Sequence, residues 1–282
     1  MGRIIVNADD FGLTAGVNRA IIELHQAGVL TSTTLMARAA AAEEAIDLAR
    51  STPSLGVGCH VVLVDGEPLR RAQKLPALVD PETGRFMPTL GKFLKRLLAG
   101  RIPSSEIEAE ASAQIGLLRS RGIALTHIDT HKHVHMFPGV LRPVLRAARA
   151  AGICAVRNPF EPAWSLRATP NAPWVRRTEV RLLRLLEPTF RHIVEEEGFT
   201  TTDGAIGVLA TGTLGAATLT SLLTNLPAGT WELVTHPGYS DVDLAQAHTR
   251  LLGSRDVERE ALLSIGSKNG LELVNFRQFG KD

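Results

Sequence analysis

Cysteine is scarce in this chain, with two residues, Cys59 and Cys154, among 282. This scarcity excludes a small secreted domain that is held together by disulfide bonds. Both cysteines stand in apolar runs, so we predict that they are buried free thiols in a reducing compartment. The first residues contain no cleavable apolar leader, which favours a cytoplasmic location.

Excess charge and long apolar runs are also missing. The formal net charge is +2, and no basic stripe is interleaved with aromatic residues, so we expect no nucleic-acid partner. No apolar run reaches the ~18 residues that a membrane-spanning helix needs, so we expect no membrane span. An arginine-rich segment at 176–191 is interpreted as a solvated helix face, with a lipid-facing surface as the alternative.

The chain does have a regular alternation of short β-branched runs and helical patterns, which predicts βαβ units and a parallel sheet. Strands are expected at 3–8, 32–37, 55–64, 123–130, 153–157, 204–210, 231–235 and 271–276. Helices are expected at 17–27, 40–50, 90–98, 105–121, 138–151, 214–225 and 256–268. A capping box from Ser105 to Glu108 is expected to open the fourth helix. We therefore predict an α/β fold, an irregular (β/α) barrel of about seven to eight parallel strands, as a single domain with insertions at about 65–103 and 158–203.

Polar residues stand out at the ends of the apolar strands. Asp9 and Asp10 end the first strand, His60 lies in the third, and His236 ends the seventh. Strands of a parallel barrel end on one rim, so we expect these side chains to converge there. Two adjacent buried carboxylates repel each other unless a cation or shared proton is present, although a helix N-cap pair is the alternative. His60 alone would more often be a core residue, but beside the other clusters it is interpreted as a ligand.

The densest cluster lies at 126–135, where the run THIDTHKHVH holds four of the nine histidines. Imidazole suits Zn, Ni and Co, and a carboxylate extends the choice to Mg and Mn. Not all of these groups can bind one ion, so some should bind substrate or support the ligands. A structural role and an unstructured metal-scavenging tract are the alternatives. In an extended chain one side would present His127, Asp129, His131, His133 and His135.

Three further residues are candidates for the same rim. His236 precedes Pro237, which keeps the backbone extended and suits a fixed general acid, with an incidental turn histidine as the alternative. Arg157 ends the fifth strand, where it is expected to orient a carboxylate unless it forms a surface ion pair. Phe11 follows the aspartate pair and is placed among the residues that bind substrate or support the ligands.

Four motifs, taken together and in this order, resemble the YdjC-like carbohydrate deacetylases. They are residues 6–12 (VNADDFG), 58–60 (GCH), 126–138 (THIDTHKHVHMFP) and His236-Pro237. The resemblance implies an irregular (β/α) barrel and one divalent metal ion. Mg and Zn are the preferred candidates for this ion, and Mn, Co and Ni are further options. It implies hydrolysis of the acetyl group from a saccharide that contains N-acetylglucosamine.

The resemblance also implies roles for individual residues. Asp10, His60 and His131 would hold the metal, Asp9 would be the general base and His236 the general acid. Stretches 61–68 and 157–162 are similar to the hopanoid-associated members of the family, which leaves a glycolipid open as substrate.

Other functions fit parts of the same pattern. A metal-dependent phosphoesterase on a similar barrel would hold two or three metals and more carboxylate ligands. A sugar- or metal-binding barrel without activity, or a partner-binding scaffold on the helical stretch at 176–197, are the non-enzymatic alternatives. A homodimer is expected from its general frequency alone.

Overall fold

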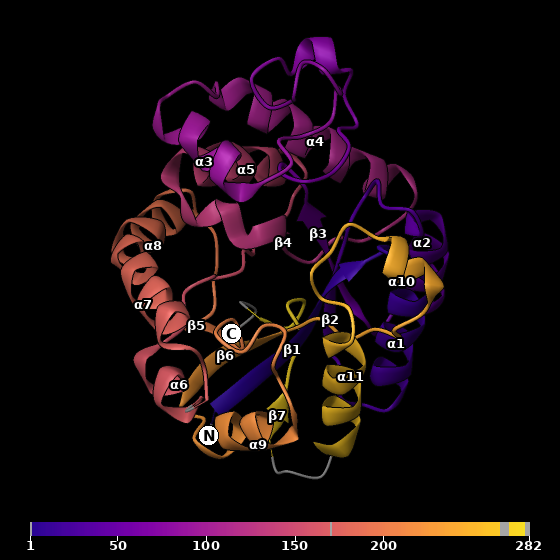
Figure 1. Cartoon of the computed structure of the whole chain (residues 1–282), viewed down its shortest axis with the longest axis vertical. Coiled ribbons are helices and arrows are strands. Elements are labelled where there is room, and N and C mark those ends of the chain that lie inside the picture. The colour runs from indigo at the N-terminus through magenta and orange to yellow at the C-terminus, as the bar shows by residue number, and fades with distance from the viewer. Residues whose placement is uncertain (1, 170, 266–270, 280–282) are drawn as a thin grey trace.

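The computed structural model describes residues 2–169, 171–265 and 271–279, and at its centre lies a curled parallel sheet (Figure 1). The strands lie in the order β4-β3-β2-β1-β6-β5, and β7 pairs with the beginning of β1. All of these pairings are parallel, as the alternating sequence pattern predicted. The strands are β1 (Gly2–Phe11), β2 (Ser32–Leu35), β3 (Gly56–Val61), β4 (Ile128–Thr130), β5 (Gly204–Ile206), β6 (Gly229–Thr235) and β7 (Glu272–Leu273).

Helices surround the strands (Figure 1), because each parallel connection must cross from one end of the sheet to the other. Nine of the ten residues of β1 are buried, as expected for a strand that is covered on both faces. The helices are α1 (Ala15–Gln26), α2 (Ala42–Ser51), α3 (Leu90–Leu98), α4 (Ser104–Ser120), α5 (Pro138–Ala150), α6 (Ala163–Ala168), α7 (Trp174–Leu183), α8 (Glu187–Glu196), α9 (Ala216–Thr224), α10 (Val242–Gln246) and α11 (Ser254–Ile265). Short 3-10 turns are η1 (Ala72–Lys74), η2 (His131–Met136) and η3 (Arg184–Leu186).

The sheet register brings the polar strand ends together. His60 of β3 is paired with Asp129 of β4, and Ala8 of β1 is paired with Thr235 of β6. Asp9 and His236, which follow the Ala8–Thr235 pair, therefore lie at the same edge of two neighbouring strands. The predicted convergence of the strand ends follows from this register.

Several predicted strands are shorter in the structure. The segment 153–157 makes only single bridges, from Val156 to Ile128 and from Ala155 to Thr200, so it is an extended link that is shared between two neighbours. The strand predicted at 204–210 ends at Ile206, because Gly207 has a φ of 87° and turns the chain. The last predicted strand, 271–276, is paired with β1 only at Glu272 and Leu273.

One prediction about a helix start was wrong, and one alternative interpretation is excluded. The Ser105–Glu108 capping box does not form: α4 begins after Pro103 without a side-chain cap, and Glu108 instead accepts a 2.8 Å hydrogen bond from Arg146. The aspartate pair is not an N-cap either, since the Thr14 side chain caps α1. The predicted end of the helix at 256–268 lies partly outside the described residues.

The cysteine prediction holds for one residue of the two. Cys59 is a buried free thiol in β3, whereas Cys154 is a free thiol that is exposed to solvent. The correction follows from the local structure, because Cys154 lies in the extended link 153–157, which is covered less completely than a central strand.

Both segments that were predicted to be insertions contain helices. Segment 65–103 carries η1 and α3 and lies at the top of Figure 1, and segment 158–203 carries α6, α7 and α8 at its left edge. Among the described residues, no helix combines the length and the apolar character that crossing a membrane requires.

Candidate active site

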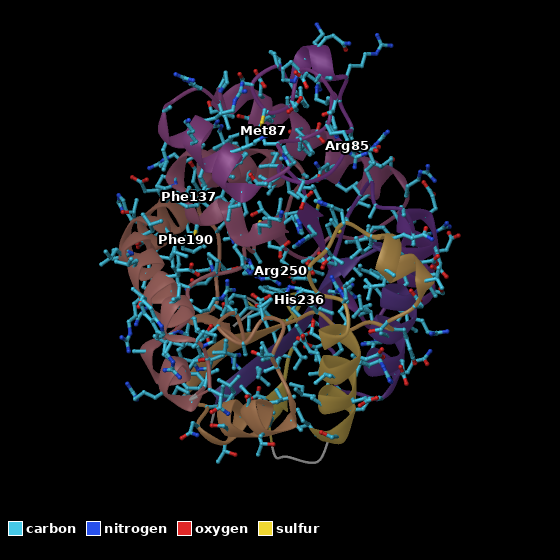
Figure 2. All side chains as sticks on the ribbon, in the orientation of Figure 1. Arg85, Met87, Phe137, Phe190, His236 and Arg250 are labelled. Atoms are coloured by element: carbon cyan, nitrogen blue, oxygen red, sulfur yellow. The ribbon has the colours of Figure 1, made fainter. Side chains whose placement is uncertain are left out.

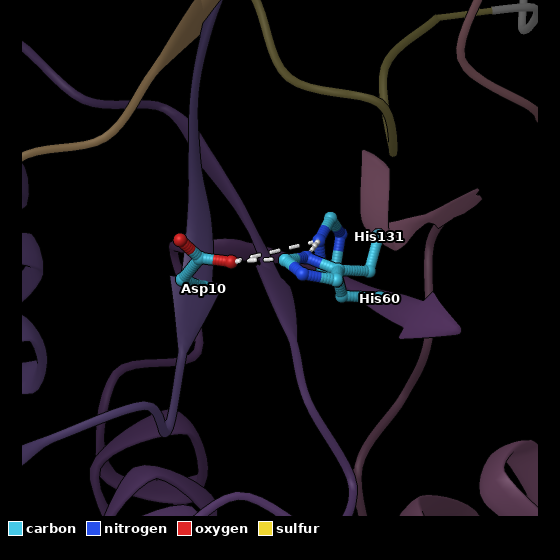
Figure 3. A group of neighbouring side chains, drawn as sticks. All are labelled: Asp10, His60 and His131. Carbon is cyan, nitrogen blue, oxygen red and sulfur yellow. Dashed lines mark hydrogen bonds and ion pairs between the residues drawn. The ribbon is translucent and has the colours of Figure 1, made fainter. Parts of the chain in front are cut away.

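Three side chains from three elements meet at the carboxyl edge of the sheet (Figure 3). The Oδ1 atom of Asp10 lies 3.7 Å from Nε2 of His60 and 3.6 Å from Nδ1 of His131, and these two ring nitrogens are 3.4 Å apart. Two ligand atoms of one tetrahedral ion, each about 2.0–2.1 Å from it, lie roughly 3.3–3.4 Å apart. The three atoms are therefore spaced as ligands of a single ion would be, and the donor set of one carboxylate and two imidazoles suits a divalent metal.

Asp10 reaches this position because the chain turns sharply beneath it. Its φ of 66° is in the left-handed region, which Asp tolerates better than most residues, and the register of β1 against β2 shifts between Ala8 and Phe11. Arg255 of α11 donates a 2.5 Å hydrogen bond to Oδ2 of Asp10. Burial opposes ionisation of Asp10, but Arg255 and His131 outweigh it and hold the pKa of this carboxyl well below its usual range.

His60 is oriented by Asp129. Its Nδ1 lies 2.8 Å from Oδ1 of Asp129 and 3.1 Å from Oγ1 of Thr34, which leaves Nε2 free to face Asp10 and His131. Burial opposes protonation of the ring, but Asp129 raises the pKa of His60 to about 9. The pocket thus favours positive charge at this point, which is what a bound cation would supply. His60 is a buried strand residue, as predicted, but not an inert one.

Asp9 points to a different partner from Asp10. The Arg157 guanidinium donates to both of its oxygens, at 2.9 and 2.6 Å, and also contacts Asp129 and Glu232. Burial raises the pKa of Asp9, but Arg157 prevails and lowers it, so the carboxylate is ionised at neutral pH. Arg157 is fully buried, so the alternative of a surface ion pair was wrong.

A second group of potential ligands, Asp9, His60 and Asp129, lies beside the first. Arg157 donates to Asp9 and contacts Asp129, and its charge already balances these two carboxylates. In the first group, Arg255 engages only Oδ2 of Asp10, and Oδ1 faces the rings of His60 and His131. The first group is therefore the better candidate for a metal ion of the two groups found in the described residues.

His236 leaves the end of β6 and lies in the middle of the ring of helices (Figure 2). Its Nε2 is 3.8 Å from Oδ2 of Asp9, and its backbone N–H donates to Glu258 at 2.8 Å. Burial lowers the pKa of His236 to about 4, so the ring is neutral at pH 7. A neutral imidazole next to an ionised carboxylate is arranged to receive a proton before it can give one.

The other histidines of the run belong to neither group of potential ligands found in the described residues. The expectation of one extended stretch was wrong beyond Thr130, because Lys132 and His133 adopt left-handed backbone angles and the chain coils into η2. His127 stacks on Phe276 with ring centroids 3.8 Å apart, and burial lowers its pKa to about 3. Neither the hydrogen bonds nor the ring contacts of His127 reach the candidate ligands.

His135 and His133 differ in what they contact. His135 links Oγ1 of Thr130, at 2.7 Å, to the carbonyl of Arg157, at 3.2 Å, so it supports the turn after β4. Nδ1 of His133 is buried and has no partner within the described residues. Phe11 is completely buried in the hydrophobic core, so it is out of reach of a substrate and can only support the neighbouring residues.

The first insertion touches the site through Asp65. Lys132, next to His131, contacts one carboxylate oxygen of Asp65 at 2.6 Å, and His248 contacts the other at 2.5 Å. Burial raises the pKa of Asp65, but Lys132 and His248 outweigh it and lower the value. Three segments that are distant in the sequence are therefore tied together beside the candidate ligands.

Four residues of this site did not stand out in the sequence. Glu232 is a carboxylate in the otherwise apolar run TWELV, a signal that was available, and burial raises its pKa to about 7 despite Arg157. Arg255 and Glu258 are one turn apart on the inward face of α11, where charged residues looked like a solvated surface. Thr34 gave no signal, because threonine is common in strands.

Comparisons with known proteins agree with one another. The family model described as YdjC-like protein matches residues 3–272. A carbohydrate deacetylase from Geobacillus stearothermophilus is 35% identical over 98% of each chain, and a human carbohydrate deacetylase is 32% identical over 85% of this chain and 76% of its own. A carbohydrate deacetylase from Brevibacillus brevis is 46% identical, and this match spans 56% of the chain and 60% of that relative.

A solved structure agrees as well. A protein from Enterococcus faecalis, proposed to be a cellobiose-phosphate cleavage protein, superposes with a TM-score of 0.77 at 26% identity and covers 98% of this chain and 97% of its own. The family match extends over nearly the whole sequence and includes all four motifs of the candidate site. The chain belongs to the YdjC-like protein family.

Proposed function

We propose that this protein is a metal-dependent hydrolase that removes the acetyl group from an N-acetylated sugar. The observation that carries the proposal is the Asp10-His60-His131 group, which is spaced for one ion and lies beside an ionised Asp9 and a neutral His236. The relatives that are called carbohydrate deacetylases and match most of this chain support this choice of reaction.

Asp10, His60 and His131 would hold one divalent ion, Mg or Zn first, with Mn, Co or Ni as further options. When bound there, a divalent ion polarises the amide carbonyl and lowers the pKa of a water molecule toward ~7. Asp129 fixes the ring of His60, and Arg255 engages the second oxygen of Asp10, so that its first oxygen faces the ion position.

Asp9 would act as the general base. It is ionised and held by Arg157, which fixes the direction in which it accepts a proton from the attacking water. His236 would be the general acid that protonates the departing amine. Because its pKa is about 4, we infer that it first receives the proton taken up by Asp9, across the 3.8 Å between Nε2 and Oδ2.

The finer description of substrate and setting belongs to the same proposal. We place the substrate among saccharides that contain N-acetylglucosamine, with a glycosylated hopanoid lipid as the alternative. We also propose an irregular (β/α) barrel in which the extended link 153–157 takes the place of one strand, a cytoplasmic location and a homodimer.

A phosphoesterase is the second candidate function. It would use two or three metals, and the carboxylates of the second group of potential ligands in the described residues, Asp9 and Asp129, are already engaged by Arg157. We therefore favour the reaction that needs one ion.

Acetate release from N,N'-diacetylchitobiose tests the proposal, measured with metal-loaded protein before and after a chelator. We expect acetate release that the chelator abolishes and that re-addition of metal restores, with one ion per chain by elemental analysis. Release that is insensitive to chelator would refute metal dependence. Two or more tightly bound ions with phosphate-ester hydrolysis and no acetate release would favour the phosphoesterase.

A further inference from the structure

Helix α7 and the following turn η3 carry an apolar face that is exposed to solvent. Trp174, Leu182 and Leu185 are 77%, 61% and 75% exposed, and Val175 is 48% exposed. These four side chains are half of the strongly exposed large hydrophobic residues in the described part of the chain. In Figure 1, α7 lies at the outer left edge of the molecule, with its long side open.

The exposed side chains share one face of the helix. Trp174, Leu182 and Leu185, with the polar Thr178 between the first two, follow the three- and four-residue spacing that places side chains above one another. The opposite face already supplies the packing, because Val180 is buried against Leu166 and Leu209. The outer apolar face therefore makes no contribution to the core and is available for a partner.

The charges around this face indicate what the partner is. Residues 174–186 contain four arginines and one glutamate, so the segment carries excess positive charge. Arg176 and Arg184 pair with Glu179 and Glu187, and Arg177 donates to backbone carbonyls of the preceding segment. Arg181 is exposed, and within the described residues its side chain has no hydrogen bond or ion pair. A second copy of this chain on the same face would bring the same arginines together across a twofold axis, which is unfavourable.

We propose that α7 and η3 dock on an anionic phospholipid surface. Trp174, Leu182 and Leu185 enter the boundary between headgroups and acyl chains, and Arg181 lies at the level of the phosphates. Exposed tryptophan, leucine and arginine on one face are the side chains that interfacial helices use. This inference does not depend on the proposed deacetylase activity.

Vesicle co-sedimentation tests the docking surface. The wild-type protein should sediment with vesicles of phosphatidylcholine and phosphatidylglycerol, less with phosphatidylcholine alone, and less again at high salt. The double variant Leu182→Ser/Leu185→Ser should bind the anionic vesicles at least about tenfold more weakly. The matched control Val242→Ser/Val257→Ser alters side chains that are 72% and 53% exposed on α10 and α11, and it should bind like the wild type.

Two outcomes would overturn the proposal. One is a wild-type protein that does not sediment with anionic vesicles, or that loses no binding in the Leu182→Ser/Leu185→Ser variant. The other is a dimer in sedimentation velocity that this variant abolishes, because a second copy would then occupy the face. Thermal unfolding by circular dichroism verifies that both double variants fold. Acetate release without vesicles tests the deacetylase proposal separately, so the two failures are distinguishable.

Discussion

Asp9 is the residue whose role is most sharply defined by its contacts. Arg157 holds both of its oxygens, so an amide at this position keeps the shape but cannot accept a proton. We expect Asp9→Asn to lower kcat for acetate release by about 10²- to 10⁴-fold, the usual worth of a positioned base. Metal content, measured by elemental analysis, should stay at the wild-type level.

The neighbouring carboxylate provides the control. Asp10→Asn and His131→Ala should lose the metal, whereas Asp9→Asn should not, because only the first two belong to the group around the ion position. Full activity of the Asp9→Asn variant would show that Asp9 is not the general base.

The raised pKa of Glu258 predicts that the stability of the protein depends on pH. Burial raises the pKa of this carboxyl from 4.5 to about 8, although it accepts a hydrogen bond from the backbone of His236. Between these two values the folded protein binds a proton that the unfolded chain does not, so Glu258 makes stability fall as pH rises from 4.5 to 8. We expect Glu258→Gln to flatten the fall that urea unfolding measures between about pH 6.5 and 8. An unchanged slope would show that Glu258 is not protonated in the folded state.

Sequence reasoning could find the residues that stand at strand ends. Asp10, His60 and His131 each terminate or follow an apolar run, and the parallel register brings such positions together. It could not find Arg255, because its bond to Asp10 spans 245 positions and nothing local distinguishes it from a surface arginine. Contacts of this kind depend on how α11 is docked, which the pattern of one helix does not specify.

At the scale of the element, α11 is a support for the site. Arg255 engages Asp10, and Glu258, one turn later, holds the backbone of His236. We expect Arg255→Gln to weaken metal binding by about 10- to 100-fold in calorimetry, the usual effect of removing a group that orients a ligand. Arg255→Lys should recover part of the loss, because it keeps the charge.

Arg259 is the matched control for this experiment. It lies one turn further along α11 and pairs with Glu23 and the Tyr239 ring, not with a candidate ligand. Arg259→Gln should therefore leave the metal affinity unchanged. Equal losses in both variants would mean that α11 acts through its overall charge and not through Asp10.

The loops at the site are joined by Asp65, which holds Lys132 and His248. Asp65→Asn removes the charge that attracts both, so the two loops should separate more easily and substrate should bind less well. We expect KM to rise by about three- to tenfold with a smaller change in kcat. Glu67→Gln, which breaks the exposed pairs with Arg38 and Arg85 in the same insertion, is the control and should leave KM unchanged.

Element boundaries show where local patterns stop being informative. The expected strand at 123–130 is paired as a strand only from Ile128, and the histidine run beyond Thr130 coils into η2. The second departure needs residues at unusual backbone angles, Lys132 and His133, which no apolar periodicity signals. Helices α3 and α5 were predicted almost to the residue, because their apolar spacing is regular and Pro138 marks the start of α5.

At the scale of the whole molecule, the metal should join segments that are far apart in the sequence. Asp10 belongs to β1, His60 to β3 and His131 to η2, so one ion would cross-link three segments of the folded state only. Binding at about 100 times Kd stabilises the folded state by ~2.7 kcal/mol. We expect metal addition to raise Tm by several degrees in calorimetry and a chelator to reverse the rise. His131→Ala should show no shift, and a shift that persists in this variant would place the stabilising ion at another site.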